Sequence, residues 1–187
     1  MEAAERTLGR EVFEEAAGHF WGVVETRPYM RARFGVARSL EDAGRLSEAI
    51  EHFRAMLALN PNDNQGVREE LMVCLLKAKR HEELDKLLKT YKNDKGKAMW
   101  NYTRALLTFR QKGDTQTARK HLREAFEDNE LVPDYLLEAL PLPAVFPDSY
   151  GLGSEEEAIL CADALMEVWH DTPGAIDWLD RAFDRFV

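Results

Sequence analysis

The stretch that decides the fold is MRARFGVARSLEDAGRLSEAIEHFRAMLALNPND, residues 30–63. Its apolar residues recur at three- and four-residue spacings, which is the period of an amphipathic helix. Gly44 suits the end of a first helix, where a positive φ is often needed. Asn60-Pro61 suits the end of a second helix, because the residue before a proline avoids the α region. The stretch therefore predicts two antiparallel helices joined by a tight turn.

Four positions in this stretch have the sizes that a closely packed helix pair needs. Ala37 and Ala49 are small where the two helices approach, and Leu40 and Phe53 are large enough to fill the gap between them. With the turn glycine and the final proline, this spacing resembles the tetratricopeptide repeat, a helix-turn-helix unit of about 34 residues. The large aromatic residue that is usual early in the first helix is replaced by Arg33.

The repeat pattern extends in both directions along the chain. Residues 11–28 look like the second helix of an earlier repeat and make a half repeat. Residues 65–93 form a degenerate repeat in which Lys79 takes the place of the turn glycine, and residues 99–131 form another repeat. We therefore expect an all-α fold over residues 1–131, a right-handed superhelical solenoid similar to tetratricopeptide-repeat proteins.

The last third of the chain, residues 132–187, departs from the repeat and is expected to form a helical cap. Its proline-rich loop, residues 141–153, cannot continue a helix because prolines remove hydrogen-bond donors. Ser154 precedes three glutamates and predicts a capped helix start. Thr172-Pro173 predicts the start of a last helix, with the threonine as cap. Two non-repeat helices should thus close the solenoid.

This third also carries a second resemblance. The segments that carry it are residues 122–129, 132–137, 153–159 and 173–175. They look like the C-terminal region of the suppressor of tumorigenicity seven family, and like a group of bacterial tetratricopeptide proteins of unassigned function. The likeness to the bacterial proteins extends over most of the chain and includes residues 25–33 and 60–66. The resemblance implies a helical scaffold without catalytic activity, and it supplies no catalytic residues.

Composition excludes several classes of protein. The 187 residues include 34 acidic and 25 basic side chains, for a net charge of −9. Such a surface repels phosphates, so we expect no nucleic-acid binding. No stretch approaches the roughly 18 apolar residues of a membrane span, and no secretory signal is evident. Cys74 and Cys161 are isolated, which fits core cysteines in a reducing compartment. We expect a cytoplasmic protein that binds no membrane.

Catalytic chemistry is not predicted. The five histidines form no short metal-ligand pair. The glycine-rich turn at residues 151–153 lacks the lysine of a phosphate loop and precedes three glutamates. No serine lies in a nucleophile-elbow pattern. We therefore expect no enzyme, no metal site and no cofactor.

The first candidate binding feature is a basic cluster around Pro28. Arg31 and Arg38 are seven residues apart on one helix face, next to Phe34, and arginine beside an aromatic ring suits a carboxylate. The alternative is that the arginines pair internally. The residues of the cluster and its possible internal partners are Arg27, Arg31, Arg33, Arg38, Glu25, Glu41 and Asp42.

The second feature lies on the first helix of the last repeat, where Trp100 and Arg110 are typical interface anchors. The alternative is that Trp100 packs under the proline-rich segment. By repeat geometry both features face one concave groove, with Val73 of the middle repeat between them. The predicted peptide-binding residues are Arg31, Phe34, Arg38, Val73, Trp100, Thr103, Leu107 and Arg110.

The leading function is a non-catalytic scaffold for protein–protein interactions, which binds a peptide or protein segment in this concave groove. One alternative is a self-associating structural module, a homo-oligomer, because unfinished solenoids expose a stacking face. A further alternative is a small-anion sensor or an enzyme accessory subunit, since arginines hold anions.

Overall fold

The computed structural model describes residues 6–92 and 96–186, with side chains described up to Phe183. Every regular element in these ranges is a helix, and no strand occurs in them, which confirms the all-α prediction. Contacts divide the chain into two compact units, Met1–Leu84 and Asp85–Val187, and each is described by itself.

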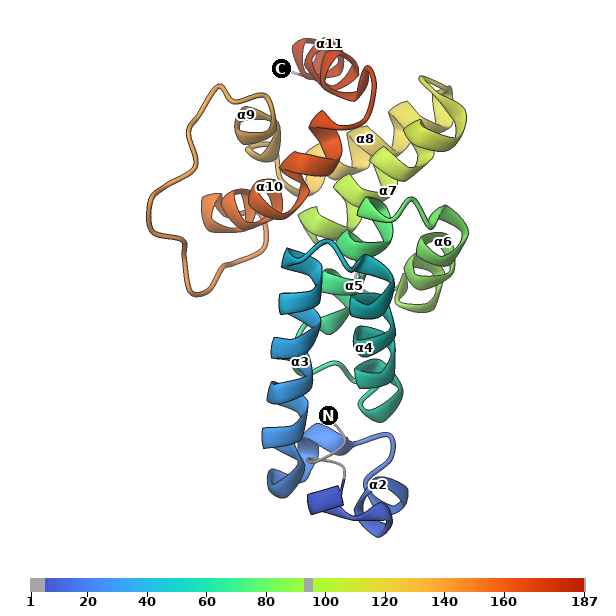
Figure 1. Cartoon of the computed structure of the whole chain (residues 1–187). Helices are drawn as coiled ribbons and strands as arrows, with labels where there is room; N and C mark the ends of the chain where they lie inside the picture. The colour runs from blue at the N-terminus through green and yellow to red at the C-terminus, as the bar shows by residue number, and fades with distance from the viewer. Residues whose placement is uncertain (1–5, 93–95, 187) are drawn as a thin grey trace. The chain divides into compact units, whose positions relative to one another are not determined.

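Unit 1 is built on one helical hairpin. Helices α3 (Arg27–Asp42) and α4 (Leu46–Leu59) pack side by side, and α5 (Val67–Lys77) packs on α4 (Figure 1). Ala37 and Ala49 are completely buried, as their small size predicted. The hairpin is the one that residues 30–63 predict.

Two of the helix-ending turns of unit 1 share one geometry, those after α3 and α5. Gly44 has a φ of 71°, and Lys79, at the corresponding place before α6 (His81–Thr90), has a φ of 55°. In each turn the next backbone N–H reaches five residues back: Arg45 to the Leu40 carbonyl, and Arg80 to the Leu75 carbonyl, at 2.8 and 2.9 Å. The degenerate repeat therefore keeps the turn without the glycine. These hydrogen bonds have the pattern of a Schellman-type helix end.

The N-terminal half repeat differs from the prediction of one helix over residues 11–28. The structure has a short α2 (Arg10–Glu15) and two 3₁₀ turns, η1 (Phe20–Gly22) and η2 (Val24–Thr26). Gly18 interrupts the helix with a φ of 87°, and its N–H donates to the Leu59 carbonyl at the end of α4. The glycine thus ends the helix early and ties the segment to α4.

Unit 2 begins with a second hairpin and adds the C-terminal helices to it. Helices α7 (Ala98–Lys112) and α8 (Gln116–Asp128) form the hairpin, and a short α9 (Val132–Leu136) follows. Helix α10 (Glu155–His170) packs on both α7 and α9, and α11 (Ala175–Phe186) packs on α9 and α10 (Figure 1). Because α10 packs on α7, this hairpin groups with the cap helices, and the unit boundary falls within the predicted repeat 65–93.

The starts of the two last helices differ in how well they follow the prediction. Ser154 caps α10 as expected, since its hydroxyl accepts from the Glu157 N–H at 3.3 Å. Thr172 does not cap α11, which begins at Ala175. Its hydroxyl instead donates to the Val168 carbonyl at 2.6 Å, so it completes the end of α10.

A buried glutamate joins α7 to α10. The Glu157 carboxylate accepts from the Ala98 N–H at 3.1 Å, from the Gly153 N–H at 2.7 Å and from the Asn129 side chain at 3.1 Å. A carboxylate at a helix N-terminus is stabilised by the free N–H groups there. This residue therefore holds the first turn of α7 and the end of the proline-rich loop against the same helix.

Over the described ranges, no helix has both the length and the apolar character that crossing a membrane requires.

Candidate binding site

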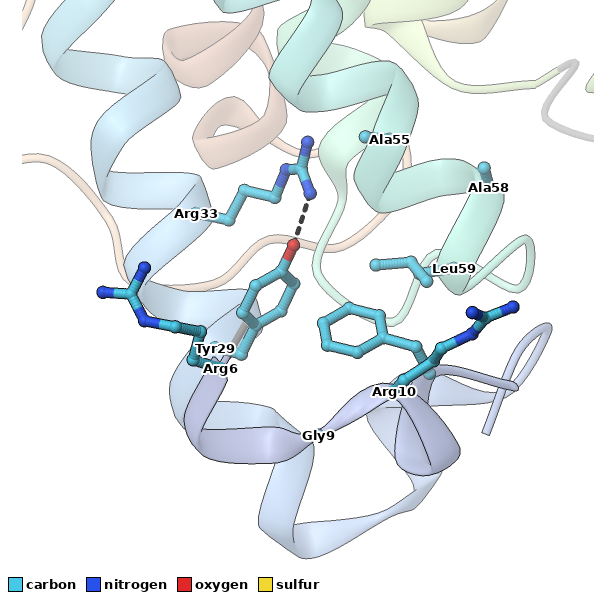
Figure 2. Close-up of a pocket in the computed structure, with 9 residues that line it drawn as sticks. Arg6, Gly9, Arg10, Tyr29, Arg33, Ala55, Ala58 and Leu59 are labelled. Carbon is cyan, nitrogen blue, oxygen red and sulfur yellow. Dashed lines mark hydrogen bonds between the residues drawn. The ribbon is translucent and has the colours of Figure 1, made fainter. Parts of the chain in front are cut away.

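An open, largely apolar pocket of about 1120 Å³ lies within unit 1, where α2 meets α3 and α4 (Figure 2). Figure 2 shows Arg33 of α3 and Leu59 of α4 pointing into the space between these helices. The lining residues are Arg6, Gly9, Arg10, Phe13, Tyr29, Arg33, Ala55, Ala58 and Leu59.

Helix periodicity explains why these residues meet. Tyr29 and Arg33 are four residues apart on α3, and Ala55, Ala58 and Leu59 follow at three- and four-residue steps on α4, so each set shares a helix face. The two alanines leave the wall of α4 without bulk. The six residues of α2 then cover only part of the face that α3 and α4 present.

Aromatic rings make one wall of the pocket. Phe13 packs edge-on against Tyr29 with ring centroids 5.1 Å apart, and it lies at the same distance from Phe20. Phe20 is completely buried and contacts Tyr29 at 5.8 Å. Tilted and edge-to-face rings at these separations attract one another, so this wall is held in place by the core.

The polar part of the pocket is cationic. The Arg33 guanidinium donates to the Tyr29 hydroxyl and lies 5.8 Å from that ring (Figure 2). Arg10 pairs with Glu14 at 2.7 Å, but both side chains are exposed and such pairs are weak. Among the lining residues in the described chain, three are arginines and none is acidic. The arrangement suits a ligand that has a carboxylate next to an apolar group.

The α3 residues of the predicted groove do not line this pocket. Arg31 is exposed and lies 5.7 Å from the centroid of the Trp21 ring, which Arg27 also approaches, at 5.6 Å. Phe34 packs edge-on against Phe53, with centroids 6.0 Å apart. Of the predicted residues on α3, Arg31 is the one with an exposed guanidinium for which the described part of the chain shows no ion pair.

Arg38 belongs to an ion-pair cluster of unit 1. It bonds to Glu70 and, at 3.3 Å, to Glu41, which also accepts from Lys77 at 3.2 Å. Two cations and two anions leave this cluster without net charge. Internal pairing, the alternative to ligand binding, is thus what the structure shows for Arg38, and Glu70 is a partner that the sequence did not indicate.

Burial in this region shifts the acid–base properties of two groups. Desolvation raises the pKa of the Glu70 carboxyl, and the charge of Arg38 offsets only part of that rise. Desolvation, together with the charges of Glu41 and Glu70, raises the pKa of the Cys74 thiol to about 12. Cys74 is therefore a protonated core residue and not a nucleophile.

The remaining predicted residues are parts of the core or of a helix end, which corrects the prediction for them. Arg110 donates from Nε to the Thr172 hydroxyl at 2.8 Å and from Nη2 to the Val168 carbonyl at 2.9 Å, so it holds the end of α10. A buried side chain presents no surface to a peptide, and the same apolar spacing serves a core face as well as a groove. The buried four are Val73, Trp100, Thr103 and Leu107.

The sequence does not predict this pocket as a site, although one of its residues points there. Arg33 stands where a tetratricopeptide repeat usually has a large aromatic residue, and Arg33 lines the pocket. A charged side chain at a position where the repeat usually has a packed aromatic residue indicates that this part of the surface differs from the usual repeat. Nothing in the sequence indicates that Arg6, Arg10 and Phe13 line the pocket, because their position depends on how the irregular N-terminal segment folds back on α4.

Comparison with known proteins supports the repeat architecture. Residues 40–107 match a family model described as tetratricopeptide repeat. The match runs from the end of α3 through α4, α5 and α6 into α7. Searches of curated proteins and of solved structures each found no match. The likeness of the last third to the suppressor of tumorigenicity seven family stays a prediction.

The class that the fold and this match support is an all-helical protein in which residues 40–107 are similar to the tetratricopeptide repeat. Repeats of this type generally mediate contacts between proteins and are typically non-catalytic. Within the described residues, no group of three or more histidine, cysteine or acidic side chains is arranged to hold a metal ion.

Proposed function

We propose that the protein is a non-catalytic interaction scaffold, and that the pocket of unit 1 holds a partner segment with an apolar side chain next to a carboxylate. The observation that carries the proposal is the lining itself: aromatic and aliphatic walls with three arginines and no acidic side chain among the described lining residues. The positive charge of this lining contrasts with the net charge of −9 of the whole chain.

The pocket has the size and the chemistry of a binding site. Ligand pockets of proteins commonly measure about 300 to 1,000 Å³ and combine apolar walls with a few polar groups that fix orientation. The pocket here, at about 1120 Å³, admits several side chains of an extended segment. Arginine beside aromatic rings provides both the charge for a carboxylate and the surface for an apolar anchor.

The test is a binding titration by fluorescence anisotropy. The probe is a labelled peptide with isoleucine and phenylalanine flanked by aspartates, and its counterpart has lysines instead of the aspartates. Ala58→Trp should block the pocket, because Ala58 lines it and is exposed, so the larger ring projects into the space. Ala32→Trp, an exposed change on α3 outside the lining, is the matched control.

A charge change tests the arginines. Arg10→Glu should weaken the acidic probe by about tenfold or more, since a lost charged hydrogen bond is worth about 1.5 to 3 kcal/mol. The lysine probe should not lose affinity. The proposal fails if Ala58→Trp and Ala32→Trp bind the acidic probe alike.

The groove along α3 remains the second location for the same function, and Arg31 carries it. Arg31→Glu should weaken the acidic probe if the segment binds along α3, and should leave it unchanged if the segment binds in the pocket. Arg38→Glu is a poor test, because it places a third carboxylate beside Glu41 and Glu70. Comparison of Arg10→Glu with Arg31→Glu therefore decides between the two locations.

A further inference from the structure

The segment between α9 and α10 in unit 2 makes a wide excursion away from both helices (Figure 1). Hydrogen bonds hold its two ends: the Leu140 N–H donates to the Asp134 carbonyl at 3.0 Å, and the Ser154 N–H to the Gly151 carbonyl at 3.1 Å. Residues 138–152, which include Leu140 and Gly151, are called the loop below. Three prolines in it fix φ and restrict the backbone to extended shapes. The hydrogen bonds and the prolines therefore reduce the number of conformations that are open to the loop.

The loop contains most of the large apolar side chains that are exposed in the described chain. Seven large apolar side chains are exposed there, and five of them belong to the loop. Val145 is 84% exposed and Leu152 is 67% exposed. Apolar surface in contact with water is unfavourable, and a concentration of it marks an interaction site. The five are Leu140, Val145, Phe146, Tyr150 and Leu152.

The charge of the loop has the opposite sign to that of the pocket. The loop contains two acidic residues, Glu138 and Asp148, and no lysine or arginine. Asp148 comes two residues after Phe146 and is exposed. An apolar pair followed closely by a carboxylate is the ligand chemistry that the pocket of unit 1 suits, with its aromatic wall and its three arginines.

We propose that the loop of a second copy of this chain occupies the pocket, a proposal that rests on the proposed function of that pocket. Val145 and Phe146 enter the apolar space between α3 and α4, and Asp148 pairs with the arginines. The contact is head-to-tail, because it joins two different surfaces of the chain. Each copy can bind one neighbour through its loop and another through its pocket. The contact therefore builds rings or open chains.

The first experiment measures the mass of the full chain in solution over a range of concentrations by analytical ultracentrifugation. The weight-average mass of the parent should rise above the monomer mass of 21.5 kDa as concentration increases. The double change Val145→Ser with Phe146→Ser, and the single change Ala58→Trp, should each weaken association at least tenfold. Val24→Ser, at an exposed valine outside the loop, and Ala32→Trp are the matched controls and should associate like the parent.

Mixing the two defective variants tests the head-to-tail geometry. The loop variant keeps its pocket and the Ala58→Trp variant keeps its loop, so an equimolar mixture should form a one-to-one dimer and nothing larger. An interface in which both copies use the same patch would not be restored by mixing. A mixture that stays monomeric, with a parent that associates, overturns the proposal.

A peptide with the sequence of residues 138–152 separates this inference from the proposed function. It should bind the parent and the loop variant, and bind Ala58→Trp at least tenfold more weakly. If this peptide fails while the acidic probe binds in a manner that depends on Ala58, the pocket keeps its function and the second-copy proposal is wrong. If neither binds, both are wrong. If the peptide binds but the parent is a monomer at every concentration, the second-copy proposal is also wrong.

Discussion

Arginines of this protein differ in the side chains that they contact. On α3, Arg38 forms ion pairs with Glu41 and Glu70, and Lys77 pairs with Glu41, so the cluster has no net charge. Arg33, on the same helix, contacts a tyrosine hydroxyl and ring and lies among apolar groups of the pocket. Two arginines five residues apart thus have different roles, because the side chains that face them differ.

Glu70→Gln should remove part of the pH dependence of stability. Desolvation places the folded-state pKa of Glu70 above its ordinary value of 4.5, although Arg38 opposes the shift and Glu41 and Glu69 add to it. The folded chain then binds this proton more tightly than the unfolded chain. The resulting stabilisation is complete below the unfolded pKa and is lost as pH rises through the folded pKa.

The measurement is urea unfolding of the parent and the variant at several values between about pH 4 and pH 7. The free energy of unfolding of the parent, relative to that of Glu70→Gln, should fall as pH rises. An exposed change on α6, Glu82→Gln, corrects for the general effect of removing one charge. A relative stability that rises with pH would contradict the shift.

Ala49→Leu should lower the free energy of unfolding by roughly 1 to 3 kcal/mol, because the added atoms have no space at the completely buried contact of the hairpin. Ala32→Leu, an exposed position on α3, should change it little. Thermal or urea unfolding measures both. If both variants melt like the parent, the register that places Ala49 at the helix contact is wrong.

Helices in this chain end by backbone geometry that tolerates different residues. Gly44 and Lys79 both take the left-handed conformation, and the same hydrogen bond closes both turns. The left-handed conformation is less favourable by about 1 to 2 kcal/mol for a residue that has a Cβ atom. Lys79 nevertheless adopts this conformation, and its turn closes with the same backbone hydrogen bond as the turn at Gly44.

Lys79→Gly should therefore stabilise the protein by about 0.5 kcal/mol, once the greater flexibility of glycine in the unfolded chain is subtracted. Gly44→Ala should destabilise it by about 1 kcal/mol for the same reason. No atom lies within 4 Å of a Cβ built at Gly44, so that effect comes from the backbone alone. Differential scanning calorimetry should show melting temperatures that move in opposite directions; a fall for Lys79→Gly would contradict the argument.

Helix α11 should be essential to unit 2. Trp178 stacks on Phe109 at 4.5 Å and on Trp169 at 6.1 Å, and its ring N–H donates to Asp114 at 2.9 Å. Removing residues 172–187 should expose these rings and cause aggregation, since the ends of a solenoid need a polar cap. Trp178→Ala should cost about 3 to 5 kcal/mol, and the exposed Asp177→Ala should cost little. A truncated chain that stays in solution and melts like the parent would make α11 an appendage.

The net charge of the whole molecule is negative, whereas the charge of the residues that line its pocket is positive. The net charge is −9, and residues 151–187 contain nine of the 34 acidic residues but only two of the 25 basic ones. An acidic ligand is therefore repelled at long range and attracted at close range. The Debye length falls from about 30 Å at 0.01 M salt to about 8 Å at 0.15 M, so salt affects the two ranges differently.

The association rate constant of the acidic probe should accordingly increase when salt is raised from about 0.01 to 0.15 M, because the long-range repulsion is screened. Its dissociation rate constant should increase too, because the contact with the exposed arginines is weakened. Stopped-flow fluorescence measures both rates. An uncharged probe, with asparagines for the aspartates, is the control, and an association rate that falls with salt would contradict this picture of the charge distribution.

The sequence by itself determined the helices and the turns of the repeats. Residues 30–63 encode their hairpin locally, through spacing at the helical period, a glycine at φ 71° and a terminal proline. The capped start of α10 at Ser154 was equally local. These features were predictable because each depends on residues within a few positions of one another along the chain.

Only the tertiary structure decided which surfaces are free. Trp100 and Leu107 have the spacing of a groove face but are buried, and Arg38 has the position of a ligand-binding cation but meets Glu70, 32 residues away. The pocket itself exists because Gly18 turns the N-terminal segment back toward the end of α4. Burial and pairing depend on what packs against a side chain from elsewhere in the chain, and periodicity within one helix carries no information about that partner.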